Sequence, residues 1–325
     1  MSERPYGRVR SDATVTAMPS LVALMVVVLK ASVFLNVLAL GMSARASDAT
    51  FVLSRPWLLL RSILAMNVVM PLIAAALVQA FNLNPALKVA LVAASLSPVP
   101  PLLPRREFKA GGAAPYTIGL LVAAAVLAVG LVPLGLTVFG WAFGKDAHVP
   151  ERAIATLVLM TVLSPLLIGV TIRYFAPLVA ERLIKPVLII GAVFLVVGTL
   201  PVPLAWRSIG ALIGNGTLLG LVAFSIAGLA VGHWLGGPDP ARRNVLALST
   251  ACRHPAIALA IASTNVAEPK PVMAAVMLYL IVSLLVSVAY VKLRPDRNAG
   301  TGRGGTVQDV LPTTAQTQTM KRALS

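Results

Sequence analysis

Apolar runs of roughly 18 residues or more recur along most of the chain, and each is long enough to cross the hydrocarbon core of a bilayer as a helix. Of the 325 residues, 58% are hydrophobic and only 12% are charged, which is too few to coat a soluble protein of this size. The runs also lack the residue alternation of a membrane β-barrel. The sequence therefore predicts an all-α polytopic membrane protein.

About nine transmembrane helices are expected in this membrane domain. The predicted spans cover residues 19–42, 56–81, 85–104, 114–140, 153–174, 184–203, 208–236, 241–265 and 270–292. A polar N-terminal tail at 1–18 and a disordered C-terminal tail at 294–325 flank a transmembrane domain at 19–293. A polar link divides that domain into repeat one, 19–140, and repeat two, 153–293.

Basic residues outnumber acidic residues by 27 to 11, which is also a feature of nucleic-acid-binding proteins. Here the basic residues lie in short loops between apolar runs, as the positive-inside rule predicts, so we expect no nucleic-acid partner. One alternate set of loops is much richer in Lys and Arg and places the C-terminus in the cytoplasm. We expect an integral protein of the bacterial inner (plasma) membrane, in contact with the lipid bilayer.

One predicted span is interrupted near its end and another near its middle. The interruptions contain Pro98, Pro100, Pro101 and Pro104 in the first half, and Pro255, next to Arg253 and His254, in the second half. Proline frees backbone carbonyls and opens a membrane helix locally. Broken helices at corresponding positions indicate an inverted-repeat transporter whose site lies where the breaks meet. The alternative is that these are ordinary proline kinks.

Charged groups at the two breaks are the main candidates for a binding site. None of the acidic residues falls inside a predicted span, so Arg253 and His254 have no intramembrane carboxylate as a partner. The partner of Arg253 could be a carbonyl freed by Pro255, water or an anionic substrate. Alternatively, the guanidinium is purely structural, or it keeps the two broken helices together in the place of a bound cation.

A second group of basic residues follows the first break. Arg105, Arg106 and Lys109 could form a cytoplasmic basic vestibule that attracts anions. The alternative is a solvated loop that obeys the positive-inside rule. The single cysteine, Cys252, and the three histidines give no ligand cluster, so no metal site is expected.

Several short motifs, taken in order, resemble the bile acid:sodium symporter family over most of residues 31–293. They are Leu40-Gly41-Met42, Ser47-Asp48, Arg55-Pro56, Met70-Pro71, Asn82-Leu83-Asn84-Pro85, Ser97-Pro98 and the run Arg243–Ser249. The resemblance implies a ten-helix fold that here lacks its first helix, with a panel domain and a core domain. It also implies two broken helices that cross in the core, and sodium-coupled uptake of organic anions.

The chain departs from the family where sodium is usually held. The family has Pro-Gly-Gly followed by Thr, Ser and Asn at the first crossing, where this chain has only Pro, Val and Leu from 98 to 104. The family's Glu and its Gln-Asn pair at the second crossing fall on Ser249, Arg253 and His254. Asn67 and Thr117 keep a polar group on the second and fourth spans. No cofactor is expected, and sodium coupling is in doubt.

The leading hypothesis is a secondary transporter of a small organic anion. Its predicted substrate-binding residues are Arg253, His254, Ser249, Asn67, Thr117 and Ser97. One alternative is a proton-coupled transporter that uses His254, or an uncoupled one. Another is a membrane sensor or scaffold that has kept the fold and lost transport. No catalytic dyad, phosphate loop or zinc motif is recognisable, so an enzyme is not expected.

Overall fold

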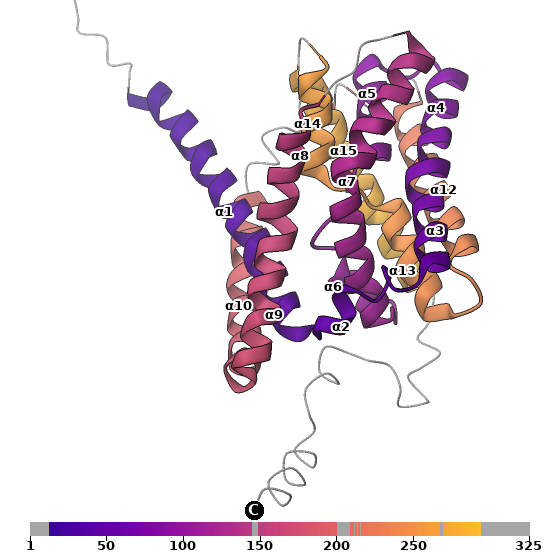
Figure 1. The fold of residues 1–325 in the computed structure, drawn as a ribbon. Helices are drawn as coiled ribbons and strands as arrows, with labels where there is room; N and C mark the ends of the chain where they lie inside the picture. The colour runs from indigo at the N-terminus through magenta and orange to yellow at the C-terminus, as the bar shows by residue number, and fades with distance from the viewer. Residues whose placement is uncertain are drawn as a thin grey trace, which may run out of the picture.

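A computed structural model describes residues 13–144, 149–199, 209–266 other than 211, 213 and 215, and 269–293. All regular structure in these residues is helical (Figure 1). The elements are α1 (Ala13–Ser43), α2 (Ala46–Ala49), α3 (Pro56–Ile63), η1 (Leu64–Val69), α4 (Met70–Ala80), α5 (Pro85–Leu96), α6 (Pro104–Lys109), α7 (Ala114–Phe143), α8 (Glu151–Val158), η2 (Leu159–Leu163), α9 (Ser164–Phe175), α10 (Pro177–Thr199), α12 (Thr217–Leu235), α13 (Pro240–Ala251), α14 (Pro255–Thr264) and α15 (Pro269–Lys292). The elements η1 and η2 are π-helical turns.

These helices confirm the predicted all-α polytopic membrane fold. Six stretches of the described chain are long and apolar enough to cross a membrane: Pro56–Ala80, Ala114–Phe143, Glu151–Phe175, Thr217–Leu235, Pro240–Thr264 and Lys270–Lys292. Shorter apolar helices occur at Val27–Ser43 and Pro85–Leu96. Helix α1 begins at Ala13, inside the predicted N-terminal tail, and the predicted C-terminal tail lies outside the described residues.

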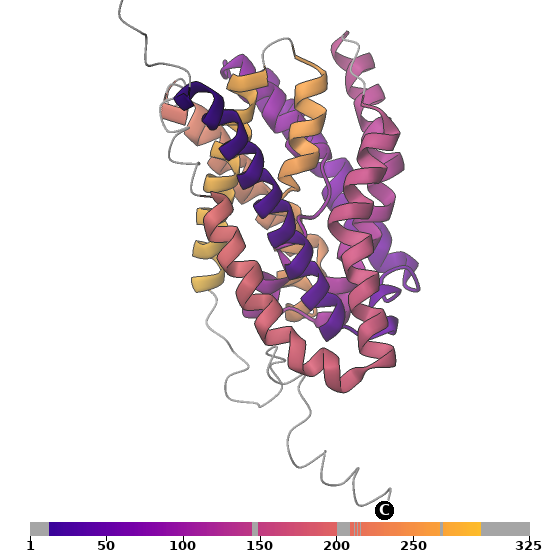
Figure 2. The same ribbon diagram turned by 90° about the vertical axis from the view of Figure 1, so that its left-hand side faces the viewer.

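The helices pack as two groups. Helix α1 packs along α10 and α9, and these three lie together in both views (Figures 1 and 2). We call α1, α8, η2, α9 and α10 the panel, and the other helices from α3 to α7 and from α12 to α15 the core. The panel meets the core where α8 contacts α7 and α14 and where η2 contacts α7. This division is the one that the family resemblance implies.

Both expected helix breaks are present in the core. One lies between α5 and α6 and the other between α13 and α14. The first half of each broken helix packs against the second half of the other, because α5 contacts α14 and α13 contacts α6. This antiparallel crossing is what two inverted repeats produce.

Glycines allow α13 to lie directly on α12. Gly228 and Gly232 on α12 and its C-cap residue Gly236 recur every four residues. A Cβ on Gly232 would lie 2.6 Å from the Cα of Ala247, and a Cβ on Gly228 would lie 2.7 Å from the Cα of Ala251. Only small residues permit such close backbone approach between membrane helices. Helix α13, the first half of the second broken helix, is therefore held against α12 by backbone packing along its length.

This packing predicts that Gly232→Ala lowers the free energy of unfolding by about 1–3 kcal/mol, because its new Cβ meets the backbone of α13. Gly130→Ala, also within a helix, is the matched control. A Cβ there would meet nothing within 4 Å, so it should be neutral or stabilise by up to about 1 kcal/mol. Thermal unfolding of the two variants in detergent measures the difference. Equal stability of the two would contradict the close packing of α12 and α13.

Candidate functional site

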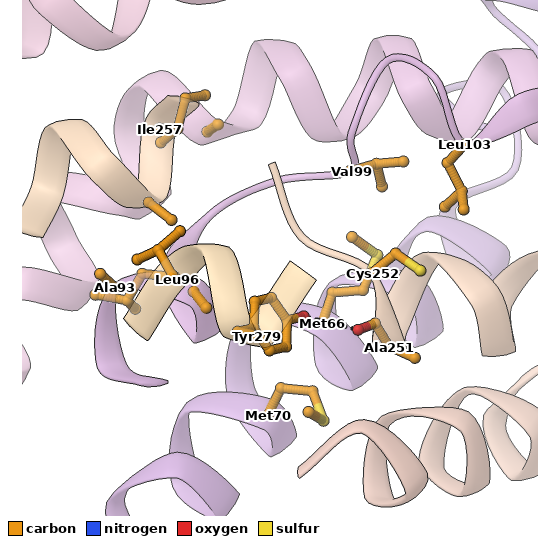
Figure 3. Packing of buried hydrophobic residues seen from close by; sticks show 14 of the residues in the cluster. Met66, Met70, Ala93, Leu96, Val99, Leu103, Ala251, Cys252, Ile257 and Tyr279 are labelled. Atoms are coloured by element: carbon orange, nitrogen blue, oxygen red, sulfur yellow. Dashed lines mark hydrogen bonds between the residues drawn. The ribbon is translucent and has the colours of Figure 1, made fainter. Parts of the chain in front are cut away.

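The two helix breaks meet in the middle of the core. The backbone N–H of His254, in the second break, donates a hydrogen bond of 2.8 Å to the carbonyl of Pro98, in the first break. Figure 3 shows Val99 and Cys252 on the extended segments that form this junction. We refer to residues 97–103 and 252–254, which lie between the half-helices, as the junction.

Arg253 joins three segments at the junction. Its Nη1 donates to the carbonyl of Ser97 at 3.2 Å, and its Nη2 donates to the carbonyl of Met66, in η1, at 2.9 Å. The side chain is only 1% exposed. Its Nε has no hydrogen-bond partner among the described residues. The guanidinium thus links both breaks to the π-helical turn while keeping further N–H groups for another ligand.

Proline explains why both of these carbonyls are available. In η1 the N–H of Met70 donates to the carbonyl of Ala65, five residues earlier. The next donor in that register, for the carbonyl of Met66, would be residue 71, which is proline and has no N–H. For Ser97 the donor in an α-helical register would be residue 101, also proline. Arg253 therefore occupies acceptors that two prolines leave open.

Tyr279 satisfies a third open carbonyl at the second break. Pro255 cannot donate to the carbonyl of Ala251, and the hydroxyl of Tyr279 on α15 donates to that oxygen at 2.7 Å. Tyr279 is buried and lies beside Ala251 near Met66 (Figure 3). The proline predicted an open carbonyl, but the sequence contains no signal that the donor comes from α15.

His254 reaches from the core to the panel. It is 4% exposed, and its Nε2 lies 3.5 Å from the hydroxyl of Thr161, in η2. Its Nδ1 has no hydrogen-bond partner in the described part of the chain. The second break therefore presents two buried nitrogens, Nε of Arg253 and Nδ1 of His254, that have no partner in the part of the chain that the structure describes.

No acidic residue falls inside a predicted span, yet the structure contains a buried carboxyl in the core. Glu107 is 1% exposed in the bundle interior, and its Oε1 accepts a hydrogen bond of 2.5 Å from the hydroxyl of Ser249. The hydroxyl of Thr117 lies against the same carboxyl, outside ordinary hydrogen-bond geometry. The third predicted span ends at residue 104, whereas in the structure Pro104 begins a short helix, α6, that packs on α7 and α13 and carries Glu107 into the core.

Helix α6 also carries the three basic residues of the predicted vestibule. Arg105 and Arg106 are partly buried and Lys109 is exposed. The alternative of a solvated loop is wrong, because α6 is a helix whose Pro104 and Glu107 are buried. A role in attracting anions stays a prediction.

The remaining predicted residues fall in different places. Ser97 is buried at the junction, where its hydroxyl donates to the carbonyl of Ala94 at 2.9 Å. Asn67 is partly buried and lines a separate cavity of about 340 Å³ between η1, α4 and α7, whose walls are almost wholly apolar. The structure thus brings Arg253, His254 and Ser97 together, gathers Ser249 and Thr117 around Glu107, and leaves Asn67 apart.

The bridging role of Arg253 predicts a large loss of stability even from a substitution that keeps the positive charge. Arg253→Lys retains one cation but has no planar fork with which to reach two carbonyls on different segments. We expect it to lower the free energy of unfolding by about 2–4 kcal/mol, since a buried hydrogen-bonded charge loses partners. Arg182→Lys on exposed α10 surface is the matched control and should be neutral. Thermal unfolding in detergent compares them, and equal stability would show that the bridge contributes nothing.

Comparison with known proteins agrees with this architecture. The sequence profile of the Sodium Bile acid symporter family matches residues 7–210, more than half of the chain, including the panel and the first crossing. A search of curated proteins finds no match. The members of the matched family are transporters, and the two broken helices with their panel and core are the features that the resemblance implied. The chain belongs to the sodium bile acid symporter family.

Proposed function

We propose that this protein is a secondary transporter of a small organic anion that does not require sodium. The observation that carries the proposal is the buried guanidinium of Arg253 at the junction. The ion pairs among the described residues are Arg173–Glu181 and Arg242–Asp239, so Arg253 has no carboxylate partner there. A buried cation without a counter-charge provides a binding site for an anion.

The substrate is expected between panel and core, at the second break. Nε of Arg253 and Nδ1 of His254 are both buried there and have no hydrogen-bond partner among the described residues, and a carboxylate or sulfonate could accept from both. The contact of His254 with Thr161 crosses the boundary between core and panel. Movement of the core against the panel would open that contact and give alternating access to the site.

The junction does not suit a sodium ion. Sodium prefers hard oxygen ligands, and the carbonyls of Ser97 and Met66 would be such ligands. Both already accept hydrogen bonds from Arg253, whose fixed positive charge would repel a second cation. The side-chain oxygens that hold sodium in the family are also missing from residues 98–104.

Two other functions remain alternatives to this proposal. Transport could be coupled to protons, or to no ion at all. A non-transporting membrane sensor or scaffold is the alternative from another class, and its support is that Arg253 fastens the two crossing helices to each other. Uptake into proteoliposomes separates a scaffold from a transporter.

Binding of an anion can be measured as a rise in melting temperature of the purified protein. We expect a bile acid or a smaller carboxylate to stabilise the wild type, because a ligand that binds only the folded state raises its stability with occupancy. The shift should be equal in sodium and potassium buffers and should be lost in Arg253→Lys but kept in Arg182→Lys. A shift that requires sodium would contradict the proposed independence, and no shift or uptake with any anion would favour the scaffold.

The loop charges predict the orientation of the chain. Arg55, Arg105, Arg182 and Arg242 belong to the basic set of loops, which should face the cytoplasm of a bacterial inner membrane. The C-terminus then lies in the cytoplasm and the N-terminus lies outside. A reporter fused after Ser325 should be active only if it functions in the cytoplasm. Activity of a reporter that works only in the periplasm would contradict this orientation.

A further inference from the structure

Glu107 is a buried acid that the proposed anion site does not use. Its carboxyl accepts from Ser249 on α13, and the hydroxyl of Thr117 on α7 lies beside it. It has no Lys or Arg partner within the ion-pair distance of 4.0 Å among the described residues. Two hydroxyls on two helices therefore surround a carboxyl that carries no compensating charge.

The position of this carboxyl is fixed by the end of α6. The N–H of Gly112 donates to the carbonyl of Glu107 at 2.8 Å after a turn in which Gly111 has φ +72°, a conformation that favours glycine. The side chain of Asn244, on α13, donates to the carbonyl of Ala110 at 2.6 Å. These bonds tie α6 to α13, so Glu107 cannot swing into solvent without moving the crossing helices.

The charged and titratable groups around Glu107 come from every element that packs on α6. Tyr116 on α7 and Cys252 in the second break interact electrostatically with the carboxyl, Arg242 on α13 acts on Tyr116, and Arg105, Arg106 and Lys109 lie on α6 itself. The hydroxyl of Tyr116 is bonded to Ser62 at 2.9 Å rather than to the carboxyl. Of the basic side chains of α6, Arg105 and Arg106 are partly buried and Lys109 is exposed. An exposed residue therefore lies two positions from Glu107 along the chain.

An ionised carboxylate in such a place is unfavourable. Burial of an unpaired charge costs several kcal/mol, and a carboxyl instead takes up a proton. A protonated oxygen would also supply a donor for the Thr117 hydroxyl, which has no hydrogen bond among the described residues. The site suits a sodium ion less well than a proton, because one carboxyl and two hydroxyls supply fewer oxygen ligands than a hard cation takes.

The geometry points to Glu107 as a proton-binding site of the core, which takes up a proton when the crossing helices are packed as here and releases it when they move. The role in coupling rests on the proposed transport function. Glu107, in place of His254, would then be the residue that couples transport to protons. The proton moves between the carboxyl and water that enters beside α6, and no other bond is made or broken.

Infrared spectroscopy of the purified protein tests proton binding without any substrate. At neutral pH exposed carboxyls are ionised, so wild type should show a protonated-carboxyl C=O band that is lost in Glu107→Gln. The amide can still accept from Ser249, which preserves the packing. Glu151→Gln, at the exposed start of α8, is the matched control and should keep the band. Absence of the band in wild type, or its loss on adding sodium at constant pH, would overturn the assignment.

Proteoliposomes test the coupling. The anion used is one that stabilises the wild type. An inward proton gradient should increase its accumulation about tenfold per pH unit if one proton is coupled to each anion. The Glu107→Gln variant should bind the same anion and show no response to the gradient, while Glu151→Gln responds like wild type. A wild type that takes up the anion without responding to the gradient would overturn the coupling role. A wild type that takes up no anion would refute the proposed transport function, and the infrared result would still decide whether Glu107 binds a proton.

Discussion

The guanidinium of Arg253 holds the centre of this protein together. It donates to carbonyls on η1 and on the first break while its own backbone belongs to the second break. Removal of one partner of a buried charged group typically costs about 3–5 kcal/mol, which is a large part of the stability of most domains. The prolines that break these helices create the acceptors, and one arginine fills two of them. Breaks and cation therefore form one unit.

This unit has consequences for transport. In a family whose name includes sodium, the crossing helices of this chain are joined by a cation that cannot leave. A fixed charge can keep the breaks in register and attract an anion, but it cannot transmit the energy of an ion gradient. Any coupling must then use another group, and Glu107 is buried one crossing away, against Ser249. Structure and coupling are thus assigned to different residues.

The sequence predicted the features that depend on local chemistry. Apolar length predicted the spans, and proline clusters predicted both breaks and the place of Arg253 and His254 within them. It did not predict partners that come from distant segments, such as the carbonyl of Met66 or the hydroxyl of Tyr279. The burial of Glu107 was not predicted, because a short helix that begins at Pro104 has the same composition as a solvated basic loop. Asn67 was predicted from the family resemblance, and in the structure it lines an apolar cavity beside η1; its role in binding stays a prediction.

Chemical rescue of Arg253→Ala is the most direct measurement of the central claim, that a guanidinium bridges the open carbonyls of Ser97 and Met66. Small alkylguanidinium ions at millimolar concentration should raise the melting temperature of Arg253→Ala, because they can donate to both carbonyls again. They should leave wild type and Gly130→Ala unchanged, and sodium should rescue Arg253→Ala less well. A melting temperature of Arg253→Ala equal to that of wild type, or one that no cation raises, would contradict the account.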